Sequence, residues 1–128
     1  MERLTRNSYP GILCGIVILI LTGIPGSFLP RVKPVIGLDK VAHIIMYATF
    51  AFVCLWGYRK QLIDSDAAFR KRAILLTILI SIAFGGLTEI LQEHLVPGRT
   101  GDVIDFLADI IGTGLGAFLF HIFLRRKK

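Results

Sequence analysis

Acidic residues stand on both sides of a turn in the last third of the chain, at spacings that would gather them on two paired helices. Residues before the turn stand at i, i+3 and i+4 and would share one helical face: Glu89, Gln92 and Glu93. Residues after it stand at i, i+3 and i+7 and would share another: Asp102, Asp105 and Asp109. The sequence Val96-Pro97-Gly98-Arg99 between them is typical of a turn, because proline and glycine do not continue a helix.

A second polar stripe comes earlier in the chain. Asp39, His43 and Tyr47 stand at i, i+4 and i+8, and Lys40 follows the first of them. If the three faces meet, they form one cup that contains six acids: Asp39, Glu89, Glu93, Asp102, Asp105 and Asp109. The cup has two fixed cations, Lys40 and Arg99, and His43 and His94 can titrate. Shared protons, a divalent cation or a cationic ligand could balance this charge, whereas a bare phosphate would need a bridging metal, Lys40 or Arg99.

Simpler structural roles could explain part of this set. Asp39 and Asp102 could each be a helix N-cap and nothing more. Arg99 could pair with an aspartate of the following helix and lock the hairpin. His94, next to the turn, is typical of an interfacial residue, and Glu93 could face water.

Three polar residues are harder to explain in structural terms. His43, Glu89 and Asp105 each stand about a turn or more inside an apolar segment, where a charged side chain is costly unless it is paired. Their types suit a metal site, and Glu89 could act as a general acid or base. We therefore predict a functional site there, with these three residues as the candidates for catalysis.

The segments that must position these residues are strongly apolar. Of the 128 residues, 54% are hydrophobic, and the mean hydropathy is +0.68. This composition predicts an all-α membrane protein with a single domain over residues 1–128 and a bundle of four transmembrane helices. The expected spans are about 10–29, 39–58, 73–95 and 102–124. Pro10 suits a first helical turn, and Pro25 should kink the first span or end it early.

Charge predicts how the chain crosses the membrane. The N-terminus, the loop 59–72, expected to be exposed to water, and the C-terminus would lie on one side, with eleven of the 15 Lys and Arg residues. The other four are Arg31, Lys33, Lys40 and Arg99. The positive-inside rule therefore predicts that both termini are cytoplasmic and that the polar cup faces outside. The net charge of +6 indicates contact with anionic lipid headgroups and not with nucleic acid.

Small residues predict how the helices pack. Gly112, Gly114 and Gly116 follow the last acid, and Gly112 and Gly116 form a small-xxx-small face. We expect Gly85 and Gly86 of the preceding span to supply the facing surface. Both cysteines, Cys14 and Cys54, lie in apolar runs and are read as small hydrophobic residues rather than a disulfide or a metal pair.

The order of these motifs resembles the VanZ-like family of small membrane proteins. The resemblance rests on Asp39-Lys40-x-x-His43-x-x-x-Tyr47, Glu89-x-x-Gln92, Pro97-Gly98-Arg99, Asp105 and Gly112, and it covers about residues 23–117. Asp109 departs from the pattern, because the family often has asparagine there. The expected ligand-binding residues are those carried over from the family, with Asp109 added: Asp39, Lys40, His43, Tyr47, Glu89, Gln92, Arg99, Asp105 and Asp109.

Two functions follow as expectations. The family's namesake is linked to low-level teicoplanin resistance, which implies a multi-pass protein of a bacterial inner or cell membrane. Its outward cup would bind a lipid headgroup or a cell-wall-linked ligand. The alternative is a membrane-embedded enzyme that acts on a lipid-linked substrate; it could use a divalent metal, although the sequence requires no cofactor. Membrane lipids are the expected partners in both cases.

Overall fold

The computed structural model describes residues 2–25, 27, 37–98 and 102–127, and the described part is helical with no strands. It comprises α1 (Glu2–Thr22), α2 (Leu38–Gly57), α3 (Arg59–Asp64), α4 (Ala67–Leu95) and α5 (Val103–Arg126). Among the described residues, three helices are long and apolar enough to cross a membrane: α2, α4 and α5. A shorter apolar helix, Arg6–Thr22, forms most of α1.

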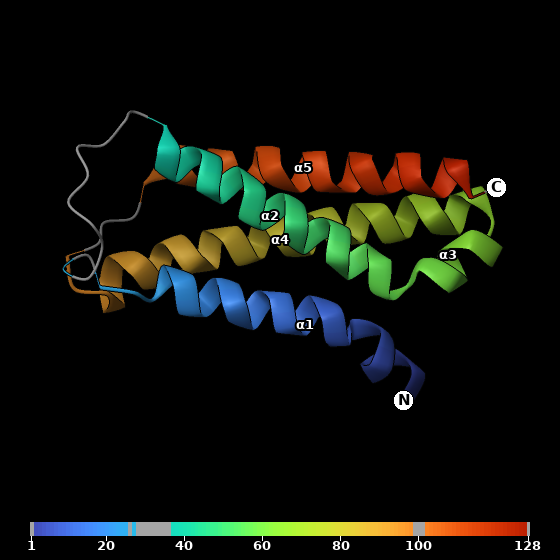
Figure 1. Ribbon diagram of the computed structural model, residues 1–128, viewed down its shortest axis with the longest axis horizontal. Helices are drawn as coiled ribbons and strands as arrows, with labels where there is room; N and C mark the ends of the chain where they lie inside the picture. Colours follow the sequence, from blue (N-terminus) through green and yellow to red (C-terminus); the bar gives the residue numbers. More distant parts are fainter. Residues whose placement is uncertain (1, 26, 28–36, 99–101, 128) are drawn as a thin grey trace.

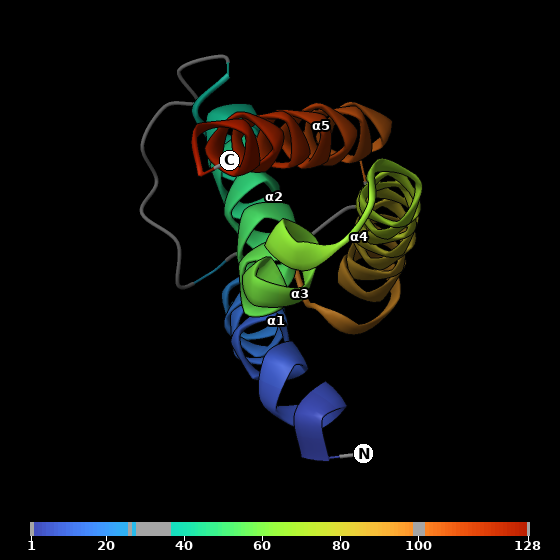
Figure 2. The ribbon, with the colours of Figure 1, turned by 90° about the vertical axis from the view of Figure 1, so that its right-hand side faces the viewer.

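The four long helices lie side by side along the longest axis of the molecule (Figure 1). Helix α2 makes its largest interface with α5 and also packs against α1 and α4. Seen from the end of the bundle, α2 lies between α1 and α5, with α4 to one side (Figure 2). The first turns of α1, the short α3 and the C-terminus share one end (Figure 1). The start of α2, the end of α4 and the start of α5 share the other end.

The second and fourth predicted spans agree with α2 and α5 to within two residues at each end. Helix α4 begins at Ala67, six residues before the predicted start at 73. Its N-cap is Asp66, whose carboxylate accepts a hydrogen bond from the backbone N–H of Phe69 at 2.7 Å. This side-chain cap satisfies a donor that the helix leaves open and extends the helix beyond the apolar run.

The bounds predicted for the first span were wrong in part. Helix α1 begins at Glu2, so Pro10 lies inside it and not in its first turn. An internal proline lacks the N–H of one helical hydrogen bond and bends a helix, and α1 is bent near its N-terminal end (Figure 1). The helix ends at Thr22, three residues before Pro25, in agreement with the early end predicted from that proline. Residues 26, 28 and 29 of the predicted span lie outside the described part.

The prediction of a water-exposed loop over 59–72 was also wrong in part. The segment contains α3 and the first residues of α4. Leu62 of α3 is only 1% exposed and packs in a cluster with Phe120 and Leu124 of α5. The reason is hydrophobic: burial of a leucine side chain is worth about 2 kcal/mol, enough to fold a short connection back onto the bundle.

Glycines bring α2 and α5 into close contact. A Cβ added at Gly112 would collide with the backbone of Ile44, and one at Gly116 with the backbone of Ala48. Small residues permit such an approach of two helix backbones. The expectation that Gly85 and Gly86 face these glycines was therefore wrong, because the facing surface belongs to α2. Sequence spacing defined the small face, but it could not define the helix against which that face packs.

Candidate functional site

The polar side chains at the starts of α2 and α5 and the end of α4 meet at one end of the bundle. We call them the polar cluster: Asp39, Lys40, His43, Glu89, Asp102, Asp105 and Asp109. Lys40 of α2 holds its outer part together. Its ammonium donates to Asp105 Oδ1 at 2.5 Å, to Asp102 Oδ2 at 3.0 Å and to Asp39 Oδ2 at 3.0 Å. All three donors of Lys40 are thus used by carboxylates, and the start of α2 is fastened to the start of α5.

Asp102 has two structural roles in this arrangement. It is the N-cap of α5 and accepts a hydrogen bond from the backbone N–H of Ile104 at 2.8 Å, as its sequence position predicted. The hydrogen bond from Lys40 is the largest of the effects that lower the pKa of the Asp102 carboxyl below its ordinary value. Asp39 does not cap α2, since the N-cap is Gly37, in a left-handed conformation with φ of 114°.

His43 lies at the centre of the inner part and faces carboxylates on both sides. Its Nδ1 is 2.7 Å from Asp109 Oδ1, a hydrogen-bonding distance, and 3.8 Å from Glu89 Oε1. Its Nε2 is 3.7 Å from Asp105 Oδ2. The close packing of α2 against Gly112 brings the His43 ring to Asp109, one turn earlier on α5. A buried imidazole between three carboxylates is suited to hold a proton or to ligate a metal.

Glu89 joins α4 to the start of α5. Its Oε2 accepts a hydrogen bond from the backbone N–H of Asp102 at 3.0 Å, across the turn. Its other oxygen, Oε1, is buried and has no hydrogen-bond partner among the residues that the structure describes. Asp109 is similar, because its Oδ2 is also buried and finds no partner in the described part of the chain. An unsatisfied buried polar atom costs on the order of 1–3 kcal/mol, more when it is charged, so these oxygens call for a ligand or a proton.

Three donors of the cluster form a group of metal-binding geometry. His43, Glu89 and Asp105 each offer one ligand atom, and these atoms all lie within 4.8 Å of one another. They come from three different helices, α2, α4 and α5, so the fold alone brings them together. An imidazole nitrogen with two carboxylate oxygens is a donor set that binds divalent ions such as zinc and manganese.

Exposure decreases steadily from the rim of the cluster to its base. The exposed fraction of the side chain falls from 60% for Asp39 and 39% for Asp102 to 14% for Asp105 and 0% for Asp109. The cluster therefore meets the surroundings through its outer carboxylates, while the unpartnered oxygens lie beneath them.

Tyr47 lies below the cluster and takes part in a separate hydrogen-bonded chain. Its hydroxyl is 2.8 Å from Thr88 Oγ1, and the Thr88 hydroxyl donates to the Gly85 carbonyl at 2.9 Å. Because a hydroxyl has one proton, Tyr47 is the donor to Thr88. The sequence alone did not single out Thr88. The signal that it offered was a hydroxyl side chain directly before Glu89. Gly85 lets Asp109 approach, since an added Cβ would lie 3.1 Å from the Asp109 carboxylate.

Gln92, another expected ligand-binding residue, contacts a different helix. Its Nε2 donates to the Thr22 carbonyl at 3.2 Å, which satisfies an open acceptor at the end of α1. Glu93 and His94 are exposed and lie outside the polar cluster. Their positions agree with the simpler alternatives, in which Glu93 faces water and His94 is an interfacial residue. Arg99 lies outside the described residues. The two cysteines are free thiols.

Comparison with known proteins identifies the family to which this chain is related. The family model described as VanZ/LLP1 matches residues 9–124. An uncharacterised protein of the fission yeast Schizosaccharomyces pombe is 31% identical over 112 residues, which cover 88% of this chain and 63% of the relative. The chain thus spans less than two thirds of that relative's length. No solved structure matches. Since the match extends over nearly the whole chain, including every residue of the polar cluster, this membrane protein belongs to the VanZ/LLP1 family.

Proposed function

We propose that the polar cluster binds a divalent cation and, through that cation, the phosphate of a lipid headgroup or of a lipid-linked ligand. The observation that carries the proposal is Glu89 Oε1, which is buried beside His43 and Asp105 and has no hydrogen-bond partner among the described residues. A cation there would satisfy the orphaned oxygen and offset the excess of carboxylates over Lys40. Without it, phosphate would be repelled by the aspartates of the rim.

The position of the cluster supports an approach from one side of the membrane. The basic residues of α3, of the first turns of α4 and of the last turn of α5 lie at the opposite end of the bundle (Figure 1). By the positive-inside rule, that basic end and both termini face the cytoplasm. The cluster then opens to the external side, where headgroups of the outer leaflet and cell-wall-linked ligands are present.

Metal binding is the first test. We expect purified wild-type protein to bind about one divalent ion per chain, measured by elemental analysis after a desalting step, and to lose thermal stability when a chelator is added. Glu89→Gln should abolish both effects, because it removes a charged ligand and keeps the side-chain shape. The matched control is Glu93→Gln, the same change at an exposed position of the same helix.

The ligand is tested in the same preparations. Binding to vesicles that contain a lipid phosphomonoester, phosphatidic acid, should require the cation and be lost in Glu89→Gln but not in Glu93→Gln. If wild type bound no metal and chelator had no effect, the cation proposal would be wrong. The cluster would then be balanced by shared protons and ion pairs.

A second candidate function is favoured by one contact. The 2.7 Å pair of His43 and Asp109 fixes the orientation of an imidazole beside the proposed metal, an arrangement that metal-dependent hydrolases use. In this case the protein would hydrolyse a lipid-linked phosphate ester, with whichever of Glu89 and Asp105 does not hold the metal acting as general base. Release of inorganic phosphate from such a lipid, dependent on the metal and on Glu89, distinguishes an enzyme from a binding protein.

A contribution to glycopeptide resistance stays a prediction from the family resemblance. It requires a bacterial envelope, whereas the relative described above is from a fission yeast. This distribution favours a phosphate headgroup, which both kinds of organism contain, over a component of the bacterial wall. Teicoplanin susceptibility of a bacterial host expressing wild type or Glu89→Gln tests the point.

A further inference from the structure

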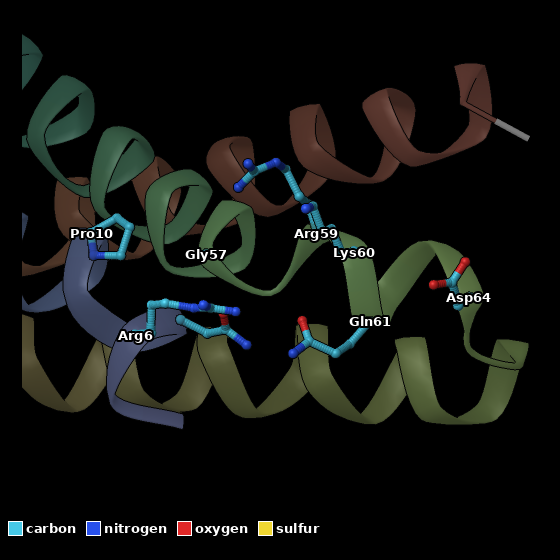
Figure 3. A pocket seen from close by; sticks show the side chains of 8 residues that line it. Arg6, Pro10, Gly57, Arg59, Lys60, Gln61 and Asp64 are labelled. Carbon is cyan, nitrogen blue, oxygen red and sulfur yellow. The ribbon is translucent and has the colours of Figure 1, made fainter. Parts of the chain in front are cut away.

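The end of the molecule opposite the polar cluster carries two basic hollows that the proposed function does not use. One is lined by residues of α1, of the end of α2 and of α3 (Figure 3). Its cations are Arg6, Arg59 and Lys60, and it also contains an acid, Asp64. The Arg59 guanidinium lies 4.7 Å from the Trp56 ring centroid and donates to the Trp56 carbonyl at 3.0 Å, directed away from Arg6 (Figure 3). This hollow is therefore partly neutralised.

The second hollow is a groove between α4 and α5, and its charges are of one sign. Arg70 and Lys71 of α4 and His121 and Arg125 of α5 line it, and none of the described residues in its lining is acidic. Arg70 donates one hydrogen bond to the Ser65 carbonyl, which directs its guanidinium at the start of α4. Three fixed cations at a membrane interface attract a phosphate, because each contributes about 1 kcal/mol toward an anionic lipid surface.

The same groove continues as an apolar channel toward the middle of the bundle. Ile74, Ile78 and Phe118 line its walls, and it has a volume of about 680 Å³. Gly114 lies along it, and a Cβ added there would meet no atom within 4 Å, so the channel is open at that point. From Arg125 to Gly114 is eleven residues of one helix, or about 16 Å. This is about half of the roughly 30 Å hydrocarbon core, the depth of one leaflet.

We propose that the α4–α5 groove binds an anionic phospholipid, with its phosphate against Arg70, Lys71 and Arg125 and one acyl chain along Gly114. The charge of the rim selects an anionic headgroup over a zwitterionic one, and the length of the apolar part fits a chain of one leaflet. The site lies at the other end of the helices from the polar cluster and needs no metal. It can therefore be present or absent whatever the polar cluster binds.

The acyl-chain part is tested by filling the groove. Native mass spectrometry of the full-length protein, released from micelles that contain equal amounts of phosphatidylglycerol and phosphatidylcholine, should show one retained phosphatidylglycerol. Gly114→Leu should remove that adduct while leaving the helical content unchanged, because the new side chain enters open space. Gly114→Ala is the control, since one methyl group leaves most of the groove open. Retention of the lipid by Gly114→Leu would overturn the placement of the chain.

The headgroup part is tested by removing charge from the rim. The triple variant Arg70→Gln, Lys71→Gln, Arg125→Gln should lower the occupancy by phosphatidylglycerol about ten-fold or more. The triple variant Arg6→Gln, Arg59→Gln, Lys60→Gln loses the same charge from the neighbouring hollow and should change it less than about two-fold. Equal losses in the two variants would show that only the overall charge of this end attracts lipid. Equal retention of the two lipids by wild type would also contradict the proposal.

Discussion

Asp109 is the residue at which the chemistry of the site and the departure from the family pattern coincide. It is fully buried, one carboxylate oxygen contacts His43, and the other has no hydrogen-bond partner within the described ranges. A buried carboxylate in this position orients the imidazole and makes it a better metal ligand, as the partner behind a metal-bound histidine does in many proteins. Its own contact with the proposed cation is not required, because His43, Glu89 and Asp105 form the group of donors.

The first prediction concerns Asp109 as the carboxylate partner of His43. Asp109→Asn keeps an oxygen for His43 and removes a buried charge, so thermal stability in detergent should change little, by about 1 kcal/mol or less. The affinity for a divalent ion should nevertheless fall about 10-fold or more. Titration with manganese, followed by electron paramagnetic resonance, measures the affinity. An unchanged affinity would mean that Asp109 has only a structural role.

At the scale of the helices, the contact of α2 with α5 positions the site. The two helices approach through Gly112 and Gly116, next to the backbones of Ile44 and Ala48. His43 precedes the first of these contacts on α2, and Asp109 lies one turn before Gly112 on α5. The distance between the helix axes therefore determines whether the imidazole reaches its carboxylate.

A second prediction separates the packing of these glycines from their helix propensity. Gly112→Ala should destabilise the protein by about 1–3 kcal/mol, because its Cβ must displace the α2 backbone. Gly114→Ala should be neutral or stabilise it by up to about 1 kcal/mol, since alanine is the better helix former and the added methyl group meets open space. Thermal unfolding in detergent, followed by circular dichroism, compares the two. If both variants were equally stable, the close contact of α2 and α5 would not matter for stability.

At the scale of the whole molecule, the chain has a polar, acidic end and a basic end. The polar cluster lies at one end, and the two basic hollows lie at the other, with apolar helices between them. Large apolar side chains remain exposed on the outer faces of these helices, among them Leu79 and Ile80 on α4 and Ile111 and Phe118 on α5. Such a surface is suited to contact lipid tails.

The orientation in the membrane gives the third prediction. In a variant without Cys14 and Cys54, a single cysteine at Glu93 (Glu93→Cys) should react with a membrane-impermeant maleimide in intact cells. A single cysteine at Lys60 (Lys60→Cys) should react only after the cells are permeabilised, because the positive-inside rule places the basic end in the cytoplasm. Both positions are exposed in the fold. The reverse labelling pattern would invert the proposed topology and direct the polar cluster inward.

Local sequence features were enough to predict the helical class, three of the four segments expected to span a membrane (α2, α4 and α5), the end of α1 before Pro25 and the faces on which polar residues lie. These features depend on local composition and on the 3.6-residue helical period, and both can be read from a single segment of the sequence without knowledge of its neighbours in space. Three contacts became known only from the three-dimensional packing: the glycine face of α5 lies on α2, Gln92 contacts the end of α1, and Lys40 joins three aspartates. Periodicity defines a face, but the partner of that face depends on the fit of all the helices together.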